Sequence, residues 1–414
     1  MSNGRWPTSS LKSLSSRIGD GIHGTPQYVE NSDYPFINGN NLKGGFIEIS
    51  QETKRVSRSE FEKHYIEFDE KTLFLSINGT LGSLAKYRGE SVILGKSAAY
   101  IKCTKINVDF LYYYLQLKAI QQQMWNVATG STIKNLSLES IRNLKIPTPS
   151  GTEQIRIAAI LSTLDAKIDS NNRINAVLEV IAKTVYDYWF VQFDFPDANG
   201  QPYKSSCGKM VYDTTLKREI PAGWKAANIL AVADLLGGGT PTKTKPEYWN
   251  GNIPFFTPTD ADGTIYKFST ADYITEKGLN ESSTKLFKKH TVFITARGSV
   301  GRLVFAGVDM AMNQSCYALR TKPGISHTYL FFLAKELIHH LQVKSSGSVF
   351  DSIVSNDIEF TNLAIPKDDV VKKFGVIVEP ILERIANNTK ENLQLTQLRD
   401  WLLPMLMNGQ VTIK

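Results

Sequence analysis

The segment Gly95-Lys96-Ser97 carries the residue types that close a phosphate-binding loop. Such a loop, GxxxxGK[ST], needs four residues between its first glycine and the Gly-Lys pair so that backbone N–H groups can surround the phosphates. Here the preceding glycine is Gly89, and five residues intervene. The matching position later in the chain, Asn313-Gln314-Ser315, has no lysine. The pattern therefore does not predict a nucleotide site.

Other segments that could hold a metal or activate a substrate lack part of the required set. Asp260-Ala261-Asp262-Gly263 has the start of a calcium loop without its later ligands or closing glutamate, so an acidic turn is the simpler interpretation. The six histidines form no HExxH, and the adjacent His339 and His340 would face different sides of a helix. No Pro-Pro pair is present, as an amino-group methyltransferase loop would need, and no GxGxxG follows a strand-like run. The sequence favours a binding or scaffold protein over a self-sufficient enzyme.

Size and composition set broader limits. The chain has 414 residues, of which 42% are apolar, enough for two or three cores. The net charge of +7 suits a polyanionic partner, although a basic protein without such a partner would look the same. Cys103, Cys207 and Cys316 are odd in number and far apart, which fits a reducing compartment and disfavours a zinc ribbon. No signal peptide and no apolar run of 18 residues is visible, so neither secretion nor membrane insertion is expected.

The sequence repeats itself at an offset near 218. Each copy reads as short β-rich runs that end in glycine loops, then a helix, a small-residue loop and an Ile-Pro pair. The matched segments are Trp6 with Trp224, 24–26 with 239–241, 73–82 with 292–301, 95–97 with 313–315, and 146–147 with 365–366. Each copy is therefore predicted to be a mixed, β-rich domain.

A long helix is expected after each copy. From Leu161 to Trp189, positions spaced alternately by three and four form one stripe, which is apolar at its ends and holds Asn171 and Asn175 in its middle. The same stripe returns 217 residues later with Asn388 and Asn392. A helix of about 37 residues is about 55 Å long, more than an ordinary core helix. We interpret the two helices as a pair that buries the stripes against each other.

Antiparallel pairing gives this stripe a consistent register. It places Asn171 opposite Asn392 and Asn175 opposite Asn388, while Leu164 opposite Arg399 is the poor match. The apolar matches are Ile168 with Leu395, Leu178 with Ile385, Ala182 with Ile381, and Val185 with Val378. Because a slipped register would set amides against leucines, we hypothesise that the asparagines fix the register and hence the spacing of the attached domains.

The predicted fold class is α+β, with two similar domains separated by two long antiparallel coiled-coil helices and a pseudo-twofold internal repeat. Pro380 lies within the second helix and could mark its start or a kink, and Pro404 and Gly409 are expected to end it. The predicted parts are a domain at 1–150, a long helix at 151–192, a turn-rich linker at 193–217, a domain at 218–367 and a long helix at 368–414.

The helical segments resemble the conserved regions of one family, the specificity subunits of type I restriction-modification systems. The first helix matches the central conserved region over 161–168, 171–179 and 186–196, and the second matches the C-terminal region over 398–404 and 408–409. The similarity is specific in the helices and looser in the two domains.

This resemblance implies a non-catalytic DNA-recognition subunit that acts in the prokaryotic cytoplasm, at the nucleoid, in defence against foreign DNA. The two domains, 1–150 and 218–367, would be target-recognition domains that each read half of a bipartite double-stranded DNA site, with the helices setting the gap. Two modification subunits would bring S-adenosylmethionine and adenine N6 methylation, and restriction subunits would add cleavage driven by ATP and Mg²⁺. No cofactor is expected on this chain.

Chemistry, rather than the resemblance, selects the candidate DNA contacts. Glycine loops let the backbone approach phosphates, and amide, hydroxyl and basic side chains bond phosphates or base edges. For each residue, a loop that only turns the chain remains an alternative. The candidates are Asn78, Gly79, Thr80, Lys86, Lys96, Thr129, Ser131, Thr132 and Lys134 in the first domain, and Lys243, Lys245, Arg297, Arg302, Asn313, Gln314, Ser346 and Ser348 in the second.

Four aromatic residues of the helices, Tyr186, Trp189, Phe190 and Trp401, could contact the modification subunits or pack within the helix pair. Two other functions stay open. A stand-alone DNA-binding regulator would bind tightly without partners, and a fused enzyme with an unrecognised active site would methylate or cleave DNA by itself.

Overall fold

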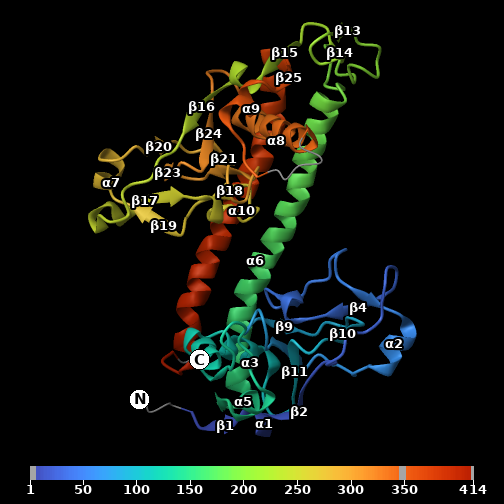
Figure 1. The fold of residues 1–414 in the computed structure, drawn as a ribbon, viewed down its shortest axis with the longest axis vertical. Coiled ribbons are helices and arrows are strands. Elements are labelled where there is room, and N and C mark those ends of the chain that lie inside the picture. The colour runs from blue at the N-terminus through green and yellow to red at the C-terminus, as the bar shows by residue number, and fades with distance from the viewer. Residues whose placement is uncertain (1–5, 345–350, 412–414) are drawn as a thin grey trace. The chain divides into compact units, whose positions relative to one another are not determined.

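The computed structural model describes residues 6–344 and 351–411, and the chain forms two compact units. Unit 1 comprises residues 1–168 and 394–414, and unit 2 comprises 169–393. The division falls inside the two long helices, α6 (Gly151–Tyr186) and α10 (Asp368–Met407), so each unit contains part of both (Figure 1). Among the described residues, none of the helices is long and apolar enough to span a membrane.

Unit 1 is built on two sheets flanked by short helices. The larger sheet has the order β2-β11-β8-β9 and the smaller one the order β10-β4-β7-β3. The strands are β2 (Ser15–Asp20), β11 (Ala98–Cys103), β8 (Thr72–Ser76), β9 (Leu84–Lys86), β10 (Ile93–Leu94), β4 (Tyr34–Ile37), β7 (Arg55–Val56) and β3 (Tyr28–Val29). The pair β5 (Leu42–Lys43) and β6 (Phe46–Ile47) lies apart, and the helices are α1 (Leu11–Leu14), α2 (Arg58–Lys63), α3 (Val108–Leu115), α4 (Lys118–Val127) and α5 (Leu138–Asn143).

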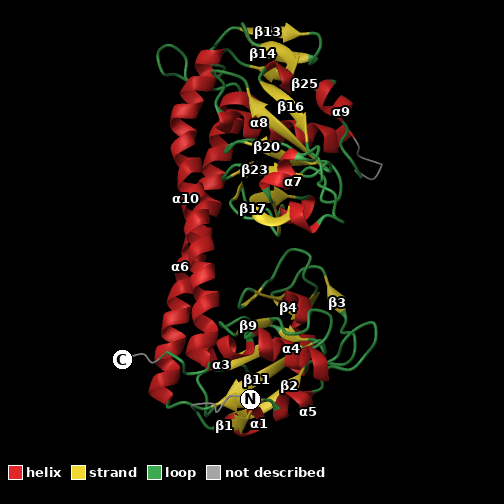
Figure 2. Cartoon of the chain, turned by 90° about the vertical axis from the view of Figure 1, so that its left-hand side faces the viewer, coloured by secondary structure: helices red, strands yellow, loops and turns green. Residues whose placement is uncertain are grey.

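Unit 2 repeats this arrangement. Its larger sheet has the order β16-β24-β21-β22-β18 and its smaller one β19-β17-β23-β20. The strands are β16 (Ala233–Gly237), β24 (Cys316–Thr321), β21 (Val292–Thr295), β22 (Leu303–Ala306), β18 (Tyr266–Lys267), β19 (Asp272–Ile274), β17 (Trp249–Phe256), β23 (Met310–Met312) and β20 (Leu286–Phe287). The helices α7 (Glu276–Asn280), α8 (His327–Lys344) and α9 (Ser355–Glu359) complete it, together with a hairpin of β13 (Met210–Asp213) and β14 (Arg218–Pro221) (Figure 2).

The repeat extends to strand pairing. β4 and β10 are parallel, as are β17 and β23 at the matching positions. In each copy a first strand pairs antiparallel with the strand just before the long helix: β1 (Thr8–Ser10) with β12 (Lys145–Pro147), and β15 (Lys225–Asn228) with β25 (Asn362–Ile365). The predicted α+β class with two similar domains is confirmed.

The apolar runs in the centre of each large sheet are explained by burial on both faces. In β8, Leu73 and Leu75 pack in the cluster that holds α3, whereas Phe74 faces a second cluster on the other side. In β21, Val292 and Ile294 pack in the larger core of unit 2, while Phe293 faces a smaller one. Since alternate residues of a strand point to opposite faces, a continuous apolar run is needed where both faces are covered.

The prolines of α10 do not interrupt it, so a start at Pro380 is wrong, and of the two residues predicted to end the helix, Gly409 follows its end whereas Pro404 lies within it. The helix runs unbroken from Asp368 to Met407, and Gly409 follows with a φ of +74°. A proline removes the bond to the carbonyl four residues earlier. Those residues, Val376 and Asp400, are exposed, so water can satisfy their carbonyl groups.

Candidate nucleic-acid interface

In unit 1, three candidate segments meet at one end of the larger sheet. Strand β8 ends at Ser76 beside Ala98, the first residue of β11, so residues 78–80 and Lys96 extend from the same edge. The N–H of Ile77 donates to the carbonyl of Ser97 (2.9 Å), and the N–H of Leu136 donates to the carbonyl of Ile77 (2.9 Å). The second bond brings the loop at 129–134 to the same place.

The loop at 129–134 is a tight turn. Thr129 and Asn135 exchange backbone hydrogen bonds of 3.0 and 2.8 Å, and Asn135 forms a bridge with Asn78. Gly130 has a φ of +102°, and a Cβ there would lie 2.2 Å from the carbonyl oxygen of Ile133. Only glycine fits this position, which explains the small residue in the sequence.

Unit 2 places its candidates in the same way. Arg297 follows β21, the N–H of Ala296 donates to the carbonyl of Ser315 (2.9 Å), and the N–H of Ile353 donates to the carbonyl of Ala296 (3.0 Å). Arg297 bridges Ser352, just as Asn78 bridges Asn135. Asn313 and Gln314 precede β24 at this edge. Ser346 and Ser348 lie outside the described residues.

Several candidate side chains already have partners within the protein. Lys86 lies opposite Leu73, toward the other end of the strand from residues 78–80, and its Nζ bonds Asp109 Oδ1 at 2.6 Å. It is therefore not part of the cluster. The other bonded side chains are Thr80 with Ser76, Thr129 with the carbonyl of Asn135, Lys134 with the carbonyl of Ala128, Lys245 with Tyr248, Arg302 with the carbonyl of Ala261, Asn313 with the N–H of Ser315, and Gln314 with Thr240.

The remaining candidates have side chains available for an outside partner. None of them makes a side-chain hydrogen bond or ion pair within residues 6–344 and 351–411, and all but the half-buried Asn78 are exposed. They are Asn78, Lys96, Ser131, Thr132, Lys243 and Arg297. Selecting residues by polarity gave no role to Ile133 in the same loop, although its side chain is 59% exposed. An apolar residue within a polar, glycine-containing loop was the available signal.

The four aromatic candidates of the helices divide into two groups. Tyr186, Trp189 and Phe190 are buried in the core of unit 2, where the two latter rings contact Phe374 at centroid distances of 5.9 and 5.0 Å. Trp401, in unit 1, is 63% exposed. Burial favours packing for the first three and leaves Trp401 available to a partner.

The asparagines pair across the helices of unit 2 in the predicted register. Asn171 Nδ2 donates to Asn392 Oδ1 (2.9 Å), and Asn388 Nδ2 donates to Asn175 Oδ1 (2.8 Å). Further bonds follow the repeat, since Asn175 reaches Thr389 (3.4 Å) and Asn392 reaches Asn172 (2.8 Å), positions again 217 apart. The predicted antiparallel amide layer is confirmed.

In unit 1 the predicted poor match between Arg399 and Leu164 is resolved by Asp165, the residue next to Leu164. The guanidinium Nη1 of Arg399 bonds Asp165 Oδ1 at 2.8 Å, so it turns away from Leu164 toward the adjacent carboxylate. Tyr113 donates its hydroxyl to Asp165 Oδ2 at 2.6 Å. Burial first, and then the bond to Asp165, raise the pKa of Tyr113 far above its usual range, so its hydroxyl remains a donor.

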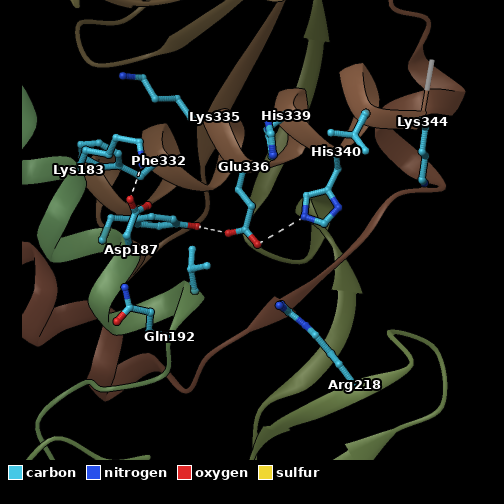
Figure 3. A pocket seen from close by; sticks show the side chains of 13 residues that line it. Lys183, Asp187, Gln192, Arg218, Phe332, Lys335, Glu336, His339, His340 and Lys344 are labelled. Carbon is cyan, nitrogen blue, oxygen red and sulfur yellow. Dashed lines mark hydrogen bonds and ion pairs between the residues drawn. The ribbon is translucent and has the colours of Figure 1, made fainter. Parts of the chain in front are cut away.

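A cavity of about 730 Å³ occurs in unit 2 between α8, the end of α6 and β14 (Figure 3). Tyr186 donates to Glu336 Oε2 (2.6 Å), His340 lies 3.8 Å from the other carboxylate oxygen, and Lys183 pairs with Asp187. Lys183 and Lys344 lie in the last turns of α6 and α8, where a positive charge is favoured by the helix dipole. The paired groups of the cavity thus serve the fold, and no group of three or more His, Cys, Asp or Glu in the described ranges could hold a metal.

Two features define the class of this protein. One is a duplicated α+β domain whose loops present polar side chains that make no hydrogen bond within the described residues. The other is a pair of long helices joined by asparagines at repeated positions. The sequence profile of the type I restriction modification DNA specificity domain matches residues 5–180 and 221–397. The chain therefore belongs to the family of type I restriction-modification specificity subunits.

Individual relatives agree with this assignment. The MjaIX specificity subunit of Methanocaldococcus jannaschii is 24% identical over 92% of this chain and 88% of its own length. The HindI specificity subunit of Haemophilus influenzae is 23% identical over 68% of this chain and 72% of its own length. The crystal structure of the type I S subunit from M. genitalium has the same fold, with a TM-score of 0.59 and 17% identity over 98% of this chain and 97% of that chain.

Proposed function

We propose that each domain reads one half of a split double-stranded DNA target, and that the paired helices fix the number of base pairs between the halves. The observation that carries this proposal is the loop arrangement, which occurs twice in one chain with matching bridges, Asn78 to Asn135 and Arg297 to Ser352. A duplicated reader suits a site of two half-sites on one duplex, because the protein repeat then mirrors the DNA.

A second repeated feature supports partner docking. Ile181 on α6 and Tyr188 on the π-helical turn Asp187–Val191 that continues α6 are exposed and lie at helical spacing, and 217 residues later the exposed Leu398 and the half-buried Met405 occupy the same positions on α10. Trp401 lies between the latter two and is exposed. An exposed apolar stripe is a common mark of an interface. Two copies of the stripe suit two copies of one partner, which we assign to the modification subunits.

The chemistry is assigned to those partners rather than to this chain. In this proposal the modification subunits carry S-adenosylmethionine and methylate adenine at N6, and restriction subunits, where present, use ATP and Mg²⁺ for cleavage. The chain itself determines which DNA sequence is recognised, and it acts in the prokaryotic cytoplasm, at the nucleoid. Incubated alone with S-adenosylmethionine, ATP and DNA, it should neither methylate nor cleave; either activity would favour a fused enzyme instead.

Mapping N6-methyladenine across a genome tests the proposal. In cells that express the chain with its modification subunit, we expect methylation at one split motif with a constant gap, and its loss when the chain is deleted. Methylation that persists without the chain, or that follows a continuous motif, would contradict the proposal.

A stand-alone DNA-binding regulator is the other candidate. It would bind its target equally well with and without modification subunits, whereas the proposed subunit should bind more tightly in the complex. Titration of a labelled duplex at fixed salt concentration distinguishes the two, because phosphate contacts make affinity strongly salt-dependent.

A further inference from the structure

The two domains place different side chains at one equivalent position. Asn78 lies two residues after the end of β8, and Arg297 lies two residues after the end of β21. Each of these strands is an interior strand of the larger sheet of its unit. Each forms a bridge with a residue of the returning loop, and the partners Asn135 and Ser352 are 217 residues apart. The backbone therefore presents both residues in the same setting, and their side chains supply the difference.

Both side chains are unengaged within the described residues. Neither the amide of Asn78 nor the guanidinium of Arg297 has a hydrogen bond or ion pair in residues 6–344 and 351–411. The neighbouring candidates Lys134, Arg302 and Gln314 bond within the protein. Unengaged polar groups at these two positions lose no internal bond when they meet a ligand.

The two side chains match different bases. An asparagine amide can bond both N6 and N7 of adenine, and an arginine guanidinium can bond both O6 and N7 of guanine. A lysine, such as Lys96 or Lys243, carries a single charged group with rotatable donors and suits a phosphate better. The difference between Asn78 and Arg297 therefore points to different base pairs in the two half-sites.

Ile133 strengthens the assignment in unit 1. It lies two residues before Asn135, which pairs with Asn78, and so within about 7 Å of chain from that bridge. Its side chain is exposed on a loop tip that is otherwise polar. The one apolar group that a base pair offers in the major groove is the thymine methyl, which belongs to the same pair as the adenine that an asparagine bonds.

We propose that unit 1 reads an A·T pair, with Asn78 on the adenine and Ile133 on the thymine methyl, and that unit 2 reads a guanine with Arg297. This inference rests on the proposed function, because it assigns bases to the two half-sites of the same target. Asn78, Ile133 and Arg297 become specificity-determining residues, while Lys96 and Lys243 contact phosphates.

Selection of bound duplexes from a random library tests the assignment, with the chain in complex with its modification subunit. Relative to wild type, Arg297→Lys should lose preference for one guanine in one half-site by roughly 5- to 150-fold and leave the other half-site unchanged. Asn78→Ala and Ile133→Ala should both lose preference at the same A·T pair of the other half-site. Lys243→Ala should weaken binding to all sequences without changing the motif.

A base analogue gives a readout that does not depend on a variant's folding. Deoxyuridine lacks the thymine methyl, so its use at the assigned position should weaken wild-type binding severalfold but leave the Ile133→Ala complex unaffected. Arg320→Lys, an exposed arginine on β24 that pairs with Asp234, is the matched control and should select the wild-type motif.

The outcomes separate this inference from the proposed function. A split motif that is identical for wild type and Arg297→Lys, or Asn78 and Ile133 changes that map to different base pairs, would overturn the inference alone. Failure of the wild-type complex to enrich any split motif would overturn the proposed function as well.

Discussion

The two units contain the same pair of helices but join them with different chemistry. In unit 2, α6 and α10 meet through a layer of amides, with Asn171 bonded to Asn392 and Asn388 bonded to Asn175, and Asn171 also donates to the carboxylate of Glu391. In unit 1 they meet through an ion pair, Arg399 with Asp165, supported by the hydroxyl of Tyr113, whereas the matching positions of unit 2 hold the buried apolar residues Ala182 and Leu382. A duplicated sequence can thus keep a helix register while replacing the groups that stabilise it.

The aromatic residues near the C-terminal ends of the two helices also differ, in their burial. The π-helical turn Asp187–Val191 that follows α6 holds a buried ring in unit 2, where Trp189 packs against Phe374. The end of α10 lies in unit 1, where Trp401 is exposed. One aromatic residue therefore stabilises its own unit, and the other is open to a partner.

The largest predicted effect separates these two tryptophans. Trp189→Ala should destabilise unit 2 by about 3–5 kcal/mol, because it removes a buried ring from the core. Trp401→Ala should change stability by less than about 0.5 kcal/mol but weaken binding of the modification subunit. Urea unfolding and a pull-down with the modification subunit measure the two effects. Equal losses of stability would remove the distinction between the helix ends.

The next effect tests the ion pair of unit 1. Asp165→Ala should cost about 2–3 kcal/mol, since it leaves the hydroxyl of Tyr113 without its acceptor and the guanidinium of Arg399 with Asp400 as its remaining partner. Asp169→Ala breaks the exposed pair with Arg173 on the same helix and should cost less than about 1 kcal/mol. Hydrogen exchange of the α6 and α10 peptides reports the change. A loss no greater than that of the control would show that the network contributes nothing.

A smaller effect is expected for the amide layer. Asn388→Ala should destabilise the helix pair of unit 2 by about 1–2 kcal/mol, because the buried amide of Asn175 loses a donor. The neighbouring Asn387 is exposed, so Asn387→Ala is the matched control. Because amides are uncharged, this loss should be the same at low and high salt, unlike that of Asp165→Ala. Salt dependence of the Asn388→Ala loss would argue against the assignment.

The smallest predicted effect concerns pH and again distinguishes the units. Burial, followed by the nearby His327 and Lys289, lowers the pKa of His290 in unit 2 to about 4. The unfolded chain then binds the proton more readily, so this contribution to stability is complete above pH 6.5 and is lost as the pH falls toward 4. The matching residue of unit 1 is Lys71, so unit 1 has no histidine at this position.

His290→Asn tests this prediction while keeping a residue that tolerates the φ of +69° at this position. Hydrogen exchange at several pH values should show a smaller loss of protection in unit 2 for the variant than for wild type between pH 6.5 and 4. An identical pH dependence in both proteins would exclude His290 as the source.

Much of the fold could be predicted because the sequence contains an internal repeat. The repeat predicted two similar α+β domains, and the four asparagines at matching offsets gave the helix register that the hydrogen bonds show. The prolines of α10 were misjudged, because the sequence does not show that the residues one turn earlier, Val376 and Asp400, are exposed, where water can satisfy their carbonyl groups. The partner of Arg399 was missed because a long side chain can reach the position beside the one it faces.

The candidate site was harder to predict than the fold. Residue types selected Asn78 and Arg297 together with Lys86 and Arg302, but only tertiary structure shows which side chains are already bonded. The same holds for Tyr186, whose hydroxyl bonds a glutamate 150 positions away. Hydrogen bonds between distant segments leave no local pattern in the sequence.

The gap between half-sites gives the most direct test of the account. Once the two half-sites are known, the complex is titrated with duplexes that keep both halves and have a gap longer or shorter by one base pair. Paired helices of fixed register predict that binding weakens by at least about tenfold for either change, because one half-site can no longer be read correctly. Equal affinity at all three spacings would contradict the claim that the helices set the distance between two readers.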